Sequence, residues 1–287
     1  MKNKSYIIRF ILICLLVLTG LTIIYIWQND DIVMTNIKYS NSKIQKGFDD
    51  YIIVQISDLH NKGFGTNQSQ LLTEIENAKP NIIVVTGDLI DSNRTDLSIA
   101  MEFVNGAVKI APVYYVSGNH EAWSGIYPDL ITQLAQAGVV ILDDKTVEIE
   151  INGDMIEMIG VADPSFTLSG YAEDSSTYRL GEKLKTLTGN NPESFKILLS
   201  HRPELINLYA DNQIDLVFSG HAHGGQFRLP IIGGLFSPGQ GFLPKLTSGS
   251  YSIEDTTMIV SRGLGNSAIP IRIFNRPEVI AVTLQSE

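Results

Sequence analysis

Five apolar, strand-like runs that end abruptly in acidic, amide or imidazole side chains constrain the fold of this chain more than any other feature. The endings are Asp58-Leu59-His60, Gly87-Asp88-Leu89-Ile90-Asp91, Gly118-Asn119-His120-Glu121, Ser200-His201 and Gly220-His221-Ala222-His223. All five histidines of the chain lie in these endings. A lone histidine is more often a surface or core residue than a metal ligand. Five of them at strand ends predict one metal site, because α/β folds build their sites on the loops that follow strands.

The runs and the segments between them predict an α/β fold. Strands expected over residues 51–57, 82–86 and 113–117 alternate with helices expected over 68–78, 97–110 and 130–137, where apolar side chains recur at helical spacing. Two later strands, over 147–151 and 155–161, flank an Asn152-Gly153 turn signal. Further strands are expected over 32–39, 195–200, 214–219, 252–253, 257–261 and 279–284. This order predicts a four-layer αββα sandwich of two mixed β-sheets flanked by helices.

An apolar segment near the N-terminus predicts a transmembrane helix. No charge occurs between Phe10 and Trp27, and Tyr6-Ile7-Ile8 extends the segment toward the roughly 20 residues that cross a bilayer. A cleaved signal peptide is the main alternative, but residues 28–31 offer no small-residue cleavage site. We therefore divide the chain into a tail over 1–9, a transmembrane anchor over 10–28, a linker over 29–31 and one folded domain over 32–287.

Positive charges on both sides of the segment bear on its orientation. Lys2, Lys4 and Arg9 favour a cytoplasmic N-terminus, whereas the lysines at 38, 43 and 46 oppose it. Because the later lysines fall within the expected domain, we predict a single-pass protein of the cell membrane with its domain on the extracytoplasmic side.

Composition excludes several classes of function. The net charge of −10 argues against a nucleic-acid partner, which would need a basic surface. The single cysteine, Cys14, lies in the apolar segment, so neither a disulfide framework nor a thiolate metal site is possible in the domain. Nothing in the sequence indicates an oligomeric state.

The residue types at the strand ends suit phosphoester chemistry. Carboxylate, imidazole and amide oxygen together form a mixed nitrogen and oxygen set that suits manganese, iron, zinc or related divalent ions. Two such ions about 3.5–4 Å apart can share a carboxylate and a hydroxide and clamp a phosphate between them. Gly87, Gly118 and Gly220 each precede a candidate ligand, where we expect them to let the backbone turn sharply.

Taken together and in order, the five endings resemble the complete motif set of the calcineurin-like metallophosphoesterases. The resemblance implies two divalent metal ions, with manganese preferred over iron or zinc. The first ion would be held by Asp58, His60, Asp88 and His223. The second would share Asp88 with Asn119, His201 and His221. His120 would face the phosphate and stabilise or protonate the leaving oxygen, and Asp91 would orient His120 through a hydrogen bond. Glu121 is either a cap or surface ion pair, or a further functional residue.

Sequence beyond the fifth ending resembles the bacterial membrane-associated branch of this superfamily. The similar stretches are Gly224-Gly225-Gln226, Arg228-Leu229-Pro230, Ser261-Arg262-Gly263-Leu264-Gly265 and Pro270-Ile271-Arg272. Ser92-Asn93 follows Asp91 where protein phosphatases carry Arg-Gly, which disfavours a phosphoprotein substrate. Arg202, Arg262 and Arg272 are candidates for contact with substrate, and a structural role is the alternative for each.

The segment over residues 229–246 is apolar, rich in Gly and Pro, and fits neither helical nor strand periodicity. One interpretation is a long loop packed over the metal site. The other is a lip that touches the bilayer and admits a lipid-linked phosphoester.

We predict a metal-dependent phosphoesterase at the membrane surface that hydrolyses a phosphodiester or pyrophosphate bond, in which a hydroxide bridging two metals attacks phosphorus. Two alternatives remain open. One is a hydrolase of nucleotide-linked lipid precursors at the inner membrane face, and the other is a metal-bound binding or scaffold protein without turnover.

Overall fold

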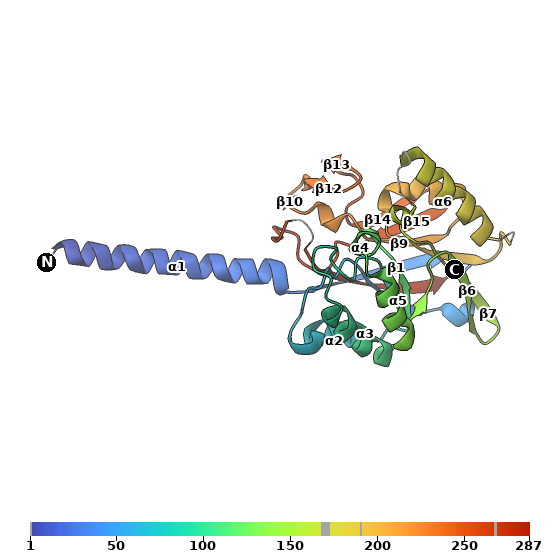
Figure 1. Cartoon of the computed structure of the whole chain (residues 1–287), viewed down its shortest axis with the longest axis horizontal. Helices are drawn as coiled ribbons and strands as arrows, with labels where there is room; N and C mark the ends of the chain where they lie inside the picture. Colours follow the sequence, from blue (N-terminus) through green and yellow to red (C-terminus); the bar gives the residue numbers. More distant parts are fainter. Residues whose placement is uncertain (1, 168–172, 190, 267–268) are drawn as a thin grey trace.

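The computed structural model describes residues 2–167, 173–189, 191–266 and 269–287. Two six-stranded β-sheets form the body of the domain (Figure 1). In the first sheet the strand order is β1 (Val33–Asn41), β16 (Glu278–Ser286), β2 (Ile52–Ile56), β3 (Ile82–Thr86), β4 (Val113–Val116) and β5 (Val140–Ile141). In the second it is β14 (Gly249–Ile253), β15 (Thr256–Val260), β9 (Leu216–Ser219), β8 (Phe195–Leu199), β7 (Asp154–Gly160) and β6 (Lys145–Ile151). Both sheets contain parallel and antiparallel pairs, as predicted.

Three apolar clusters hold the layers together. Because side chains alternate along a strand, Ile53 of β2 enters the core between the two sheets, while Val54 enters the core on the outer face of the first sheet. That outer core includes residues of helices α2 (Ser69–Asn77), α3 (Ser98–Ile110) and α5 (Tyr127–Gln136). A third core joins the second sheet to α6 (Glu173–Leu187) and α7 (Ile206–Asp211). The predicted four-layer αββα sandwich is confirmed.

Most predicted elements are present, with boundaries that shift by a few residues. Both β3 and β8 are buried at every position, because helices and the opposing sheet cover both faces. Asn152 and Gly153 have φ values of 54° and 91°, as the tight turn between β6 and β7 requires. The elements that were not predicted include α4 (Asn119–Ser124), β5, α6 and α7.

The segment over 229–246 contains short strands, contrary to the expectation that it fits no regular structure. β10 (Arg228–Leu229) pairs with β11 (Gly233–Gly234), and β12 (Phe236–Ser237) pairs with β13 (Gly241–Phe242). Ladders of two residue pairs are too short to leave a periodic pattern in the sequence.

Helix α1 (Lys2–Asp30) projects from the domain (Figure 1). From Tyr6 to Asp30 it is long and apolar enough to cross a membrane. The helix includes residues 2–9 of the predicted tail and residues 29–30 of the predicted linker. Asn29 is buried, and its Oδ1 accepts a hydrogen bond from the amide nitrogen of Arg272 at 2.8 Å. The helix therefore joins the domain through a packed contact.

Candidate metal centre

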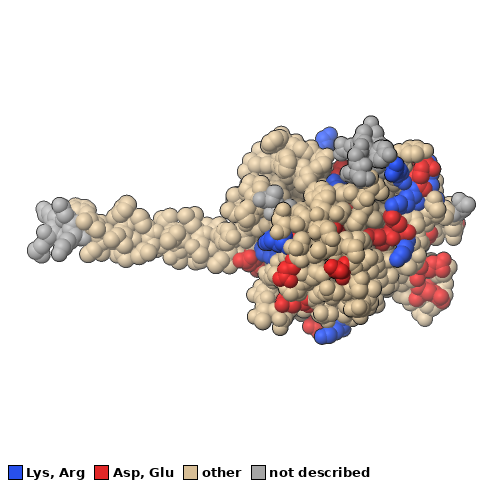
Figure 2. Space-filling view, in the orientation of Figure 1, with Lys and Arg blue, Asp and Glu red and all other residues tan. Residues whose placement is uncertain are grey.

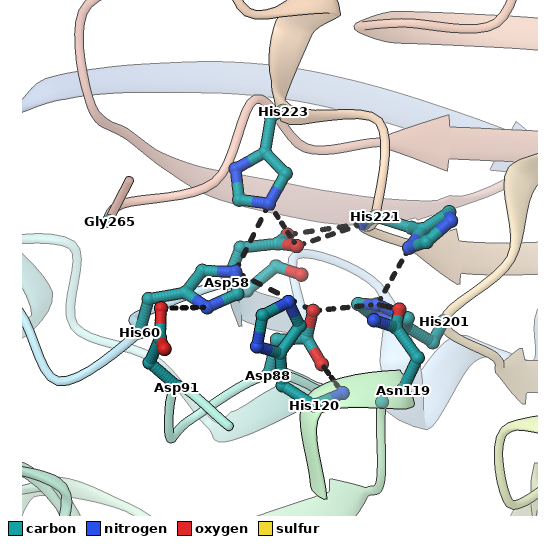
Figure 3. A network of polar contacts seen from close by, with 12 residues as sticks. Asp58, His60, Asp88, Asp91, Asn119, His120, His201, His221, His223 and Gly265 are labelled. Atoms are coloured by element: carbon teal, nitrogen blue, oxygen red, sulfur yellow. Dashed lines mark hydrogen bonds and ion pairs between the residues drawn. The ribbon is translucent and has the colours of Figure 1, made fainter. Parts of the chain in front are cut away.

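The two sheets place the strand-end side chains around one point (Figure 3). Asp58 and His60 follow β2 and Asp88 follows its neighbour β3, while Asn119 and His120 begin α4 after β4. His201 follows β8 in the second sheet, and His221 and His223 follow the adjacent β9. Parallel strands end at the same edge of their sheet, so the packing of the two sheets joins both sets.

The backbone at five of these residues is in the left-handed region that side chains other than glycine rarely adopt. They are Asp58 (φ 53°), His60 (47°), Asp88 (54°), His221 (64°) and His223 (47°). Hydrogen bonds between loops hold this conformation. The amide nitrogen of Asp58 lies 3.0 Å from the carbonyl oxygen of Gly87, and that of His60 lies 3.0 Å from the carbonyl oxygen of Asp88. Conformations of this kind concentrate at functional sites.

One group of ligand atoms comes from Asp58, His60, Asp88 and His223. Nε2 of His60 lies 3.1 Å from Nε2 of His223 and 3.5 Å from Oδ2 of Asp88. Nε2 of His223 lies 3.4 Å from Oδ1 of Asp58. Four donor atoms from three loops thus face one another in a buried space.

A second group contains Asp88, His201 and His221, with Asn119 beside them. Nε2 of His201 lies 3.2 Å from Oδ2 of Asp88, 3.2 Å from Oδ1 of Asn119 and 3.2 Å from Nδ1 of His221. Nδ1 of His201 lies 2.7 Å from the carbonyl oxygen of Thr86, which directs Nε2 toward the group. Oδ2 of Asp88 therefore lies between the two groups.

The electrostatics of the site suit divalent cations. Burial lowers the pKa of His60 to about 3 and also lowers the pKa values of His221 and His223, so these rings are neutral and offer lone pairs. Among the described residues, Nδ1 of His60 and Nδ1 of His223 are buried without a hydrogen-bond partner. Burial raises the pKa of the Asp58 carboxyl to about 6. A cation would offset the cost of burying this carboxylate beside Asp88, so the donor set fits divalent metal ions.

The glycines before the ligands act in two ways. Gly87 has a φ of 87°, as expected for a sharp turn. Gly118 and Gly220 are required for space instead, because their φ values are outside the left-handed region. A Cβ on Gly118 would lie 2.2 Å from Oδ1 of Asp88, and one on Gly220 would lie 1.9 Å from Oγ of Ser57.

Glu121 connects the loop of Asp88 to the loop of Gly118 by hydrogen bonds. It is fully buried, so the alternative of a surface ion pair is wrong, whereas its role as a cap of α4 is confirmed. Oε2 accepts hydrogen bonds from the amides of Asp88 (2.8 Å) and Gly118 (2.7 Å), and Oε1 accepts one from Ile90 (3.3 Å). Burial raises the pKa of Glu121 to about 8, while the three amide donors act in the opposite direction.

His120 obtains its orientation from a residue that we did not predict. The amide nitrogen of Ser92 donates to Nδ1 of His120 at 3.0 Å. Asp91, which was expected to orient His120, has its Oδ2 3.7 Å from Nδ1 of His60 and 3.3 Å from Nη2 of Arg94. A carboxylate oxygen of Asp91 also lies within 4.8 Å of ring nitrogens of both His60 and His120, so the expected role of Asp91 stays a prediction. Oγ of Ser92 also lies 3.2 Å from Nδ1 of His120, so both the backbone and the side chain of Ser92 face this ring.

The three candidate arginines lie in different surroundings. Arg202 is bound by Asp163 through contacts of 2.6 and 3.0 Å, and its Nη1 lies 3.0 Å from Nε2 of His221. Arg262 pairs with Glu278 at 2.8 Å. Arg272 is buried, and its guanidinium donates to the carbonyl oxygens of residues 262, 265 and 275, an arrangement that favours a structural role.

Comparison with known proteins gives a consistent result. Residues 51–225 match the calcineurin-like phosphoesterase family. The metallophosphoesterase YkuE of Bacillus subtilis (strain 168) is 30% identical over 263 residues, which cover 86% of this chain and 83% of that protein. The metallophosphoesterase Cj0846 of Campylobacter jejuni is 28% identical, with 100% of this chain and 73% of that protein covered. A transmembrane protein with metallophosphoesterase domain from Bos taurus is 29% identical, with 82% of this chain and 53% of that protein covered.

Proposed function

This chain belongs to the calcineurin-like phosphoesterase family, and from that premise we propose that it hydrolyses a phosphodiester or pyrophosphate bond at a membrane surface with two divalent cations. The main support for this proposal is the position of Asp88. Its Oδ2 lies 3.5 Å from Nε2 of His60 and 3.2 Å from Nε2 of His201. One carboxylate oxygen thus lies near both groups of ligand atoms, where it would be shared by two cations about 3.5–4 Å apart.

The ligand set divides around that carboxylate. Asp58, His60 and His223 would hold one cation together with Asp88, and Asn119, His201 and His221 would hold the other with it. The bound cations would supply positive charge to the phosphate and lower the pKa of a water molecule. We propose manganese for both positions, with iron or zinc as the alternatives that the same donor atoms admit.

His120 would act on the leaving group without binding a cation. Because the Ser92 amide donates to Nδ1 of His120, a neutral His120 ring carries its proton on Nε2. That N–H would donate a hydrogen bond to the leaving oxygen and stabilise its negative charge. The Ser92 contact therefore selects the tautomer that can act as this donor.

Replacement of His120 by alanine is expected to lower kcat by about 10²- to 10³-fold, the usual cost of losing one hydrogen-bond donor to a developing oxyanion. The metal content of the purified variant, measured by elemental analysis, should equal that of the wild type. Loss of a cation in His120→Ala would instead place His120 among the ligands and contradict its role toward the leaving oxygen.

The proposed substrate class depends on where the domain lies in the cell as well as on the chemistry of the site. We propose that α1 (Lys2–Asp30) anchors the chain in the cell membrane, with the domain over 32–287 on the extracytoplasmic side and a lipid-linked phosphoester as substrate. The apolar length of α1 and the transmembrane relative support the anchor. If added protease fails to cleave the domain in intact cells, the domain lies inside. That result would favour nucleotide-linked lipid precursors as substrates.

The decisive experiment uses the full chain in detergent, freed of metal by chelation and titrated with manganese. Hydrolysis of an activated aryl phosphodiester is followed beside that of the matching monoester, and zinc and iron are compared with manganese. We expect diester turnover to rise until two equivalents are bound and to exceed monoester turnover. Two bound cations without hydrolysis of either ester would instead establish a metal-bound binding or scaffold protein.

A further inference from the structure

Two loops expose large apolar side chains on the side of the domain from which α1 projects (Figure 1). The first loop spans β10 to β13, and no charged residue occurs between Leu229 and Pro244. Its exposed apolar side chains are Leu229, Ile231, Ile232, Phe236, Phe242 and Leu243. Figure 2 shows this lobe, above the base of α1, with almost no Lys, Arg, Asp or Glu on its surface. A contiguous exposed apolar area of this kind marks a contact surface.

The second loop exposes Ile271, Ile273 and Phe274. The charged residue among them, Arg272, turns its guanidinium inward onto backbone carbonyls and is only 2% exposed. The outer surface of this loop is therefore apolar as well, although its sequence alternates in polarity.

The tips of both loops combine a left-handed backbone conformation with large apolar side chains. Ile231 (φ 74°), Leu243 (51°) and Phe274 (49°) are in the left-handed region, and a β-branched residue such as Ile231 is rarely found there. Ile231 is nevertheless fully exposed, and Phe242 is 83% exposed. Strain and exposed apolar surface are both unfavourable in water, so their combination points to an apolar partner.

The second loop runs along the membrane helix. A cleft of about 420 Å³ is lined by Leu21, Ile24 and Trp27 of α1 and by the apolar side chains of the second loop. Leu21 precedes Trp27 by six residues, or about 9 Å of helix at 1.5 Å per residue. If Trp27 lies at the membrane interface, as tryptophans at the ends of apolar spans do, the loop reaches the level of the acyl chains.

Two contacts fix this geometry. Asn29 of α1 bonds the amide nitrogen of Arg272 at 2.8 Å, and the guanidinium of Arg276 lies 5.2 Å from the centre of the Trp27 ring. The loop and the helix therefore keep one relative position, and any bilayer that surrounds α1 meets the loop.

We propose that residues 229–243 and 271–274 form a bilayer-docking surface, here called the membrane rim, whose apolar side chains enter the membrane beside α1. The occupant is the lipid bilayer, because the rim is continuous with the apolar surface of α1 and carries no exposed charge. This inference rests on the anchor role in the proposed function, and it adds a second, independent attachment of the domain.

The membrane rim is also joined to the metal centre. The amide of Leu235 donates to the carbonyl oxygen of Gly225 at 3.1 Å, two residues after His223. Asn275 directly follows the second loop, and its Nδ2 donates to the carbonyl oxygens of His223 (2.7 Å) and Gln226 (2.9 Å). Both loops thus hold the backbone around one candidate ligand. Insertion of the rim would place the centre next to the bilayer surface, where a lipid-borne phosphoester lies.

Site-directed spin labelling of the full chain in proteoliposomes tests the membrane rim without any measurement of hydrolysis. A nitroxide on the native Cys14, within α1, is the reference for the bilayer interior. In a Cys14→Ala background, Phe242→Cys and Ile273→Cys report on the two loops. Met155→Cys is the matched control, since Met155 is an exposed apolar residue of β7, at the far end of the domain from α1 (Figure 1).

We expect labels at 242 and 273 to collide readily with oxygen and poorly with a water-soluble nickel chelate, as the Cys14 label does, and the Met155 position to show the reverse. An aqueous profile at either 242 or 273 overturns the proposal. Spin–spin broadening at these positions that persists in detergent would show a second copy of the chain there and would also overturn it. An aqueous profile at Cys14 itself would mean that the anchor, and with it the proposed membrane location, is wrong.

Discussion

Asp88→Asn is expected to lower kcat/KM by at least about 100-fold and to remove one of the two proposed cations, because loss of even an outer partner of a metal site commonly costs 10- to 100-fold. The substitution preserves size but replaces the charged Oδ2 that lies between His60 and His201. Oδ1, which accepts the amide hydrogen of His120 at 2.8 Å, can still be an amide oxygen. The loops should therefore keep their positions while the shared ligand is lost, and isothermal titration with manganese measures the change.

Asp215→Asn is the matched control. Asp215 is also a buried carboxylate, but it lies just before β9. It binds the Lys43 side chain and accepts a hydrogen bond from the amide of Lys196 in β8. It lies one strand length, roughly 13 Å for four residues at about 3.3 Å each, from the end that bears His221. Turnover and cation stoichiometry should be unchanged in this variant. If Asp88→Asn still binds two cations with wild-type affinity, the shared-carboxylate assignment is wrong.

Gly220→Ala is expected to damage the site without removal of any ligand. The added Cβ would lie 1.9 Å from Oγ of Ser57 and 2.5 Å from Oδ2 of Asp58, so both side chains must move. Overpacking of this kind lowers the free energy of unfolding by about 1–3 kcal/mol. Displacement of Asp58 should in addition weaken cation binding by about 10- to 100-fold. Thermal unfolding in detergent and manganese titration measure the two effects separately.

Gly63→Ala is the appropriate comparison, since a Cβ at Gly63 meets nothing within 4 Å. Its stability and cation affinity should match those of the wild type. A Gly220→Ala protein with unchanged affinity would show that the loops relax without moving Asp58, and the steric explanation would fail.

The proximity of the strand-end residues could be predicted from the sequence, because it follows from the order and direction of the strands. Asp58 and Asp88 follow neighbouring parallel strands, and so do His201 and His221, so each pair meets at one edge of its sheet. Their roles as ligands remain predictions. The contact between Ser92 and His120 was not predictable, since it depends on the path of the loop that brings Ser92 to Nδ1 of His120.

In the second loop of the membrane rim, the polarity of the residues does not predict which side chains are buried. In Pro270-Ile271-Arg272-Ile273-Phe274 the usual rule places the arginine outside and the apolar residues inside. The structure inverts this arrangement, because backbone carbonyls from residues 262, 265 and 275 surround the guanidinium. Helix α6 is a different case. Leu180 and Leu184 recur at helical spacing and pack in the core, so its signal was present in the sequence.

The strand order of the first sheet has a consequence for biosynthesis. β16 is the last strand of the chain, yet it lies between β1 and β2, and Val33 pairs with Glu278, roughly 245 residues away. Such distant pairing makes folding slow, and unpaired strand edges invite aggregation. During synthesis β1 therefore stays unpaired until residues 278–286 have been made. A copy truncated before Glu278 would expose the edges of β1 and β2 that β16 covers, so completion of the first sheet depends on a strand that is synthesised long after its neighbours.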